Sequence, residues 1–143
     1  MTVQELVQEM HGWGMRVTAQ RLAVAEVLVN SRDHPTAQEV CERVRARFPH
    51  ITMSTIYNTI NVLAQRGVIQ PLSFPAATRY DANRLPHANL VCVQCRAIID
   101  AADEEGWVSR LREQVISNSG FEVMWQRVDF YGLCPRCAAK GAS

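Results

Sequence analysis

The first thirty residues place apolar side chains at the spacing of an α-helix. One run ends near Gly12, and its apolar members recur every three or four positions: Val3, Leu6, Val7 and Met10. A second run begins after Thr18, whose hydroxyl can accept a hydrogen bond from a helix N-terminus, and it breaks at Asn30. We therefore expect two amphipathic helices, one before Gly12 and one between Thr18 and Asn30.

Two further helices are expected downstream. Thr36 and Glu39 have the spacing of a capping box, and the helix that they begin is expected to run to Pro49. Ser54 is expected to begin a fourth helix, which Gly67 ends. The buried side of this fourth helix is indicated by three apolar residues: Ile56, Ile60 and Leu63.

The opposite side of the fourth helix carries no charge. Its hydrogen-bonding residues form one strip: Ser54, Tyr57, Asn58, Asn61 and Gln65. Most solvated helix faces carry Glu and Lys instead, so the strip is unusual. After this helix, residues 68–72 and 78–80 are typical of two short strands joined by a Pro/Ala turn. Helices followed by a hairpin predict a winged helix.

A second domain is expected beyond a short aperiodic stretch rich in turn-forming residues. Its pattern predicts strands over residues 89–93, 97–101 and 121–131 and a helix over residues 104–118. One face of that helix carries Trp107, Leu111 and Val115, which suit either a core or a dimer face. The chain is therefore expected to be α+β, with a winged-helix domain, a hinge and a small α/β domain over residues 1–81, 82–87 and 88–143.

The composition is that of an ordinary globular protein. The 143 residues are 48% hydrophobic and 20% charged, which is enough for a core without disulfides. A net charge of +1 does not by itself indicate a nucleic-acid or membrane partner, so such a partner must be argued from local residues. We expect a cytoplasmic location, because the chain shows neither a leader pattern nor an apolar stretch of about 20 residues.

Four of the five cysteines form two C-x-x-C pairs, Cys92 with Cys95 and Cys134 with Cys137. In a reducing compartment such pairs are more often metal ligands than disulfides. Zn²⁺ binds four thiolates tetrahedrally and then has no position left for water, so we expect a structural zinc site. Two separate redox-active thiol pairs are the alternative. Cys41 is expected to be a core residue of the third helix.

In their order along the chain these features resemble the ferric uptake regulator family of metal-dependent transcription factors. The resemblance runs nearly end to end and is carried by six segments: Gly14-Met-Arg-Val-Thr-Ala-Gln-Arg21, His34-Pro-Thr-Ala-Gln-Glu39, Ser54-Thr-Ile-Tyr-Asn58, Arg79-Tyr-Asp81, His87-Ala-Asn-Leu-Val-Cys-Val-Gln-Cys95 and Phe130-Tyr-Gly-Leu-Cys-Pro-Arg-Cys137. It implies that the first domain binds operator DNA, that the second forms a homodimer, and that a metal ion at the hinge controls DNA affinity.

The resemblance assigns DNA reading to the first part of the uncharged strip, before Gln65. Tyr57 and Asn58, with Ser54 and Asn61 beside them, would enter the major groove. Asn can pair with adenine there, and a Tyr ring can contact a thymine methyl group. Contacts to phosphates or to the minor groove are expected of three arginines: Arg16, Arg21 and Arg79.

The resemblance also implies a regulatory metal site at the hinge. The matching ligand positions hold His34, Asp81, His87, Asn89 and Asp100. Asn89 stands where family members carry the second histidine of an H-x-H unit, and it offers only a neutral amide oxygen. The mixed nitrogen and oxygen set suits Mn²⁺, Fe²⁺ or Zn²⁺, and the lost imidazole favours the harder ions.

Aspartate at positions 81 and 100, with Asn58 after Tyr57, resembles the peroxide-stress branch of the family. In that branch bound Fe²⁺ reacts with hydrogen peroxide and oxidises a ligating histidine, which releases DNA; the matching histidines are His34 and His87. The implied function is that of a metal-dependent repressor. Two alternatives remain: an iron, manganese or zinc uptake regulator of the same family, and a metal-independent DNA-binding protein that has lost its sensor site.

An enzyme is the alternative from another class. An open site of His34, Asp81, His87 and Asp100 could in principle activate water, but it would need a substrate pocket and a general base. The chain contains no H-E-x-x-H motif of zinc hydrolases. We therefore expect a regulator without catalytic activity.

Overall fold

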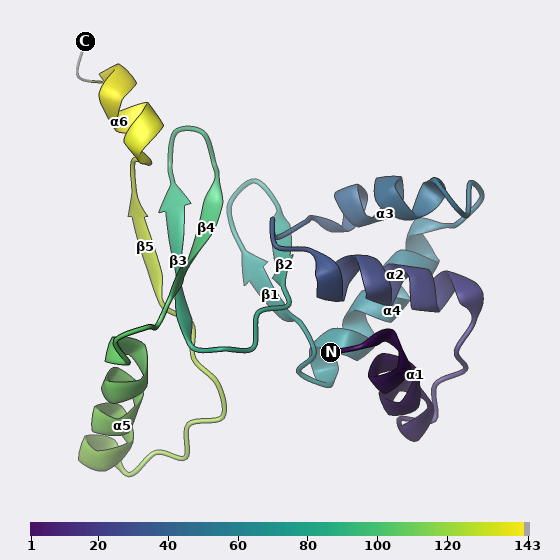
Figure 1. Cartoon of the computed structure of the whole chain (residues 1–143), viewed down its shortest axis with the longest axis horizontal. Coiled ribbons are helices and arrows are strands. Elements are labelled where there is room, and N and C mark those ends of the chain that lie inside the picture. Colours follow the sequence, from purple (N-terminus) through teal and green to yellow (C-terminus); the bar gives the residue numbers. More distant parts are fainter. Residues whose placement is uncertain (142–143) are drawn as a thin grey trace. The chain divides into compact units, whose positions relative to one another are not determined.

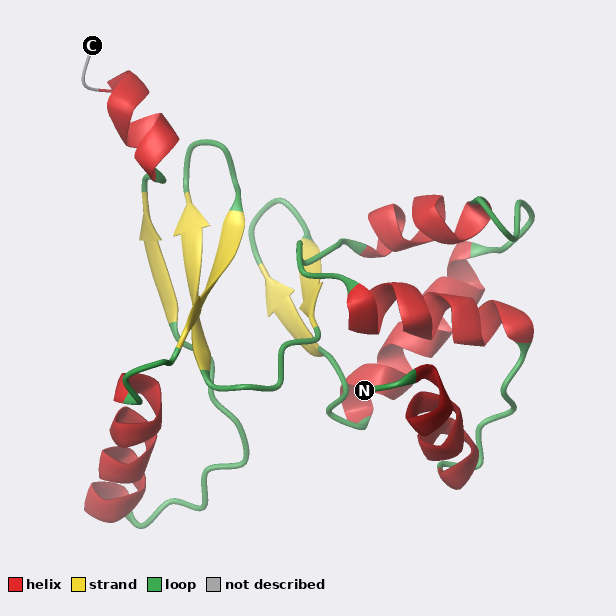
Figure 2. Ribbon diagram, viewed as in Figure 1, coloured by secondary structure: helices red, strands yellow, loops and turns green. Residues whose placement is uncertain are grey.

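The computed structural model describes residues 1–141, which form two compact units. The first unit is Met1–Arg84, and the second begins at Leu85. Figure 1 labels the elements of each unit along the chain, and Figure 2 distinguishes helices from strands. Among the residues that the structure describes, no helix is both long and apolar enough to cross a membrane.

The first unit contains four helices and a hairpin. The elements are α1 (Val3–Gly12), α2 (Ala19–Asn30), α3 (Ala37–Arg45), α4 (Met53–Gln65), β1 (Gln70–Ser73) and β2 (Thr78–Asp81). Every one of these helices begins after a threonine whose hydroxyl accepts a backbone hydrogen bond: Thr2, Thr18, Thr36 and Thr52. The predicted cap at Thr18 and the capping box of Thr36 and Glu39 are confirmed.

Two predicted helix boundaries in this unit are wrong. Helix α4 begins at Met53 rather than Ser54, because Thr52 rather than Ser54 accepts from the first helical turn. Helix α3 ends at Arg45 rather than continuing to Pro49.

The apolar faces of the four helices meet in one core. The predicted inner side of α4 is confirmed, since Ile56, Ile60 and Leu63 are all buried. They belong to a cluster that also contains Leu6, Met10, Val24, Leu28, Val40 and Val44. Cys41 is fully buried in the same cluster, as predicted from its place on the third helix.

The second unit is a three-stranded sheet with two helices. Its elements are β3 (His87–Cys92), β4 (Ile98–Ala102), α5 (Trp107–Ser119), β5 (Asp129–Gly132) and α6 (Pro135–Gly141). The central strand β3 pairs with β4 antiparallel and with β5 parallel. Within this unit α5 and α6 lie near opposite ends of the sheet (Figure 1).

The predicted strand over residues 121–131 is wrong for most of its length. Only residues 129–132 form β5, and Phe121, Met124 and Trp125 are exposed. The register explains the difference, because Asn89 pairs with Asp129 and β3 begins only two residues earlier, at His87. Residues before that point have no strand to pair with. Helix α6 was not predicted, although Pro135 at its first position is a typical helix start.

Candidate metal centres and nucleic-acid interface

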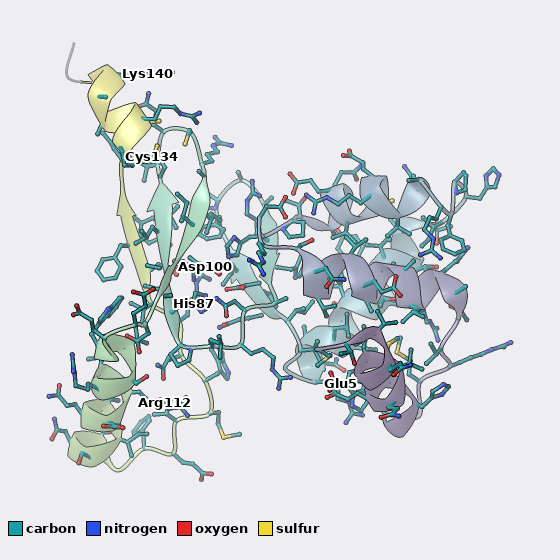
Figure 3. All side chains as sticks on the ribbon, viewed as in Figure 1. Glu5, His87, Asp100, Arg112, Cys134 and Lys140 are labelled. Atoms are coloured by element: carbon teal, nitrogen blue, oxygen red, sulfur yellow. The ribbon has the colours of Figure 1, made fainter. Side chains whose placement is uncertain are left out.

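The two C-x-x-C pairs come together in the second unit. The sulfur atoms of the four cysteines all lie within 4.8 Å of one another. The sulfurs of Cys95 and Cys134 are 3.8 Å apart, which is about the edge of a tetrahedron with Zn–S bonds of about 2.3 Å. Figure 3 labels Cys134 between the end of β5 and α6. The donor set and its spacing fit a structural zinc ion.

The protonation of these thiols also fits a cation. Backbone N–H groups of Cys134 and Cys95 lower the pKa of Cys92 to about 6, and the N–H of Cys134 lies 3.4 Å from the Cys92 sulfur. By contrast, the neighbouring Cys134 thiol and burial raise the pKa of Cys137 to about 12. The Cys137 thiol therefore stays protonated near neutral pH by itself, and Zn²⁺ would supply the charge that favours its thiolate.

The first unit contains one histidine–aspartate pair. His34 Nε2 and Asp81 Oδ2 are 3.8 Å apart, and both side chains are buried. Strand β2 holds the segment before α3 in place, because the N–H of Tyr80 donates to the carbonyl of Pro35. The guanidinium of Arg79 donates to the carbonyl of His34 at 3.1 Å. His34 has a φ of 52°, a left-handed conformation that is uncommon outside glycine. No pattern in the sequence indicated this conformation.

The second unit contains the matching pair. His87 Nε2 and Asp100 Oδ1 are 3.7 Å apart, from β3 and β4, and Figure 3 labels both. The Nδ1 atom of His87 lies 2.7 Å from the carbonyl oxygen of Leu85. A carbonyl only accepts, so Nδ1 is the donor. In the neutral ring Nε2 then carries the lone pair, the arrangement typical of metal-binding histidines.

Asn89 lies on the same face of the sheet, directly opposite Asp100. Its side-chain NH₂ group donates to Asp129 of β5 at 3.1 Å. Burial alone would raise the pKa of Asp129, but hydrogen bonds from Arg127, Asn89 and Tyr131 outweigh it and lower that pKa. Sequence reasoning missed Asp129, because only the register of β3 and β5 places it beside Asn89.

The uncharged strip of α4 lies on the surface. Ser54, Tyr57, Asn58 and Asn61 are all exposed, and Tyr57 is exposed by 47%. Two of the arginines are close neighbours, since the Arg21 guanidinium donates to the carbonyl of Arg16 at 2.8 Å. The Arg79 side chain is 27% exposed, and its Nη1 atom lies 3.8 Å from Oε2 of Glu39.

Comparison with known proteins decides the family. The family model described as the ferric uptake regulator family matches residues 12–131. The chain belongs to this family. The peroxide operon regulator of Bacillus subtilis (strain 168) is 32% identical to this ferric uptake regulator homologue, over 96% of this chain and 94% of that protein.

Solved structures agree with this assignment. A zinc-bound manganese uptake regulator is 29% identical, with a TM-score of 0.66 over 94% of this chain and 99% of the other. The Campylobacter jejuni peroxide stress regulator is 23% identical, with a TM-score of 0.75 over 96% of this chain and 99% of the other, and it shares the fold. The predicted α+β class is confirmed. As a member of the family, the chain is a metal-dependent transcriptional regulator.

Proposed function

We propose that this chain is a metal-dependent repressor that binds operator DNA as a homodimer and senses peroxide through iron in its regulatory site. The observation that carries the proposal is the pairing of His34 with Asp81 in one unit and His87 with Asp100 in the other. The sensing role is supported by two relatives that align over nearly their whole length, a peroxide-responsive repressor and a peroxide operon regulator. The metals then have structural and regulatory roles rather than catalytic ones, in a cytoplasmic protein whose thiols stay reduced.

The proposed regulatory ion takes its ligands from both units. His34 and Asp81 would supply two of them, and His87, Asn89 and Asp100 the rest. His34 Nε2 and Asp81 Oδ2 lie 3.8 Å apart in a buried position, so one divalent cation could bind both atoms. Fe²⁺ or Mn²⁺ suits this set, because carboxylate and amide oxygens favour harder ions.

We assign DNA binding to residues 1–81, the hinge to 82–87 and dimerisation to residues from 88 onward. One ion held by ligands from both units would select one interdomain angle. In a two-fold dimer that angle sets the distance between the reading helices, which must match major grooves about 34–36 Å apart. A coupling of about 1–3 kcal/mol between metal and DNA is the usual strength of such control.

We assign sequence reading to α4, through Ser54, Tyr57, Asn58 and Asn61. These exposed, uncharged groups can bond to base edges without adding sequence-independent attraction to phosphates. Backbone positioning is assigned to Arg16, Arg21 and Arg79.

Peroxide sensing is assigned to the two histidines. Bound Fe²⁺ supplies the redox chemistry with hydrogen peroxide. His34 and His87 would hold the ion through imidazole nitrogens and would be the side chains exposed to oxidation. Once either ring is modified, its unit loses a ligand and the DNA-binding geometry is no longer favoured.

DNA binding with and without metal tests this function. A duplex selected from random DNA by the Mn²⁺-loaded protein is used in anaerobic fluorescence anisotropy. Tight binding is expected with Mn²⁺ or Fe²⁺ and weak binding after EDTA treatment. Peroxide should release DNA from the Fe²⁺ form but not from the Mn²⁺ form. Mass spectrometry of the released Fe²⁺ form should detect an added oxygen atom on His34 or His87. Metal-dependent DNA binding that resists peroxide would instead identify a metal-uptake regulator. Equal DNA binding with and without metal would identify a metal-independent DNA-binding protein.

Base reading has its own test. Asn58→Ala should cost about 1–3 kcal/mol on the selected duplex and little on random DNA. Gln65→Ala, at the far end of the same exposed strip, is the matched control. Equal losses on both duplexes for Asn58→Ala would contradict base reading by this residue.

A further inference from the structure

Asn89 occupies the centre of a polar sheet face. It lies on the middle strand β3, opposite Asp100 of β4 on one side and Asp129 of β5 on the other. Directly paired residues project from the same face of a sheet, and so does His87, two positions earlier on β3. The face therefore presents candidate metal ligands on one side of Asn89 and a different carboxylate on the other.

Hydrogen bonds determine which way the Asn89 amide points. Its NH₂ group donates to Asp129 Oδ1 at 3.1 Å. The other carboxylate oxygen, Oδ2, is 2.7 Å from the Arg127 guanidinium and accepts from the Tyr131 hydroxyl at 3.1 Å. A carboxylate held by a guanidinium has no proton to donate, so only the amide nitrogen can face it. The amide oxygen must then point the other way, toward the Asp100 side.

That oxygen has no protein partner. Asn89 is only 3% exposed, and its Oδ1 atom accepts no hydrogen bond from any residue within 1–141. A buried carbonyl oxygen without a donor or a cation is unfavourable, commonly by about 1–3 kcal/mol. The fold therefore keeps one oxygen directed at the face that carries His87 and Asp100.

We infer that Asp129 is a positioning residue that locks Asn89 with its amide oxygen as a ligand of the regulatory ion. This inference rests on the proposed function. It concerns position 89, where family members carry a third histidine ligand and this chain carries an asparagine. The ligand set becomes two imidazole nitrogens and three oxygens. Such a set shifts preference from Zn²⁺ toward Mn²⁺ relative to the site with histidine at position 89.

Four variants of the full chain test the inference. Asn89→Leu removes the oxygen at similar volume. Asp129→Asn keeps the shape but changes the hydrogen bonding: Arg127 holds the new amide oxygen, so the new NH₂ group faces Asn89 and attracts the Asn89 oxygen away from the ion. The third variant combines both changes, and the fourth, Asn89→His, restores the imidazole.

The measurement is Mn²⁺ affinity, from the electron paramagnetic resonance signal of free Mn²⁺, with Zn²⁺ competition on protein that retains its structural zinc. Asn89→Leu and Asp129→Asn should each weaken Mn²⁺ binding about 10–100-fold. This is the usual loss of metal affinity when a residue that orients a metal ligand is changed, and loss of the ligand itself should cost at least as much. The double variant should be no weaker than Asn89→Leu, because Asp129 acts through Asn89. Asn89→His should raise the Zn²⁺ to Mn²⁺ affinity ratio at least tenfold.

Controls separate the possible failures. Asp103→Asn changes another carboxylate of the second unit and should leave Mn²⁺ affinity unchanged. Unchanged Mn²⁺ affinity in Asn89→Leu, or additive losses in the double variant, would overturn the inference and leave the regulatory site intact; a water molecule would then satisfy the oxygen. If Asp129→Asn fails to fold, Asn89→Leu and Asn89→His still decide whether the oxygen binds the ion. If the wild-type chain binds only structural zinc, the proposed function fails as well.

Discussion

At the residue scale, three of the five proposed regulatory ligands are among the most deeply buried polar residues. Four polar side chains of the described chain are almost fully buried: His34, Thr59, Asp81 and Asn89. The hydroxyl of Thr59 donates to the carbonyl of Thr55 within its own helix, so its burial needs no ligand. The other three occupy proposed metal-ligand positions; Asp81 also accepts from the N–H of Asn83, and Asn89 donates to Asp129.

The cysteine cluster gives a prediction at the same scale. Cys134→Ser should abolish stoichiometric zinc binding and the cooperative unfolding of the second unit, because one sulfur ligand is lost. Zinc content by mass spectrometry and unfolding followed by circular dichroism measure both. Cys41→Ala, which changes the cysteine outside the cluster, should keep one zinc per chain. A Cys134→Ser protein with full zinc and an unchanged transition would disprove the site.

The N-terminus of α5 is stabilised by a side chain that does not come from the usual cap position. Gly106, with a φ of 71°, precedes the helix and has no side chain to cap it. Asp103 takes this role from three residues further back, since its two carboxylate oxygens accept from the N–H groups of Val108 and Ser109. Burial opposes ionisation of Asp103, but these N–H groups outweigh it and lower its pKa.

This carboxylate predicts a pH dependence for the stability of α5. A carboxyl group whose pKa is lower in the folded state than in the unfolded state stabilises the fold at pH values above its unfolded pKa of about 3.9. This stabilisation is lost as the pH falls through the pKa of the folded state. Asp103→Asn should therefore lower the unfolding temperature by a constant amount from pH 5 to pH 8. Below about pH 4 the gap from wild type should narrow. A gap that widens in acid would contradict this role.

The two units differ in how completely they bury their apolar residues, which bears on the whole molecule. The first unit has a large core. Within the described part of the second unit, the buried apolar residues are Ala88, Cys92, Val108 and Cys137. Many larger ones are exposed: Leu90, Ile99, Leu111, Val115, Ile116, Phe121, Met124, Trp125, Phe130, Tyr131 and Leu133. So much exposed apolar surface on so small a unit is typical of a protein–protein interface.

We therefore expect dimerisation through the second unit to depend on its exposed apolar residues. Val115→Glu should shift the protein toward monomer in sedimentation velocity experiments, because a charge would be buried in the interface. Val3→Glu is a matched control, since both valines are 45% exposed and Val3 belongs to the first unit. A dimer that tolerates Val115→Glu would exclude this face of α5 from the interface.

Local patterns were sufficient to predict most elements. The capping box before α3, the buried side of α4, the surface strip of Tyr57 and Asn58, and the two cysteine pairs were all visible in the sequence. They depend on residue type and short spacing, which act within one helix or one turn. The order of these motifs carried the resemblance to the family, and the resemblance in turn implied the fold class and the regulatory metal ligands.

The sequence by itself thus determined five of the six helices, the caps at Thr18 and Thr36, the family and the types of ligand available. Only the tertiary structure decided where β5 begins, that α6 forms, that His34 is left-handed, and that Asp129 orients the amide of Asn89. The start of β5 and the orientation of Asn89 depend on strand register, which brings together residues 40 positions apart, as in the Asn89–Asp129 bond. A periodic pattern cannot specify such a pairing, because the register is set by which partner strand is available and not by the alternation within one strand.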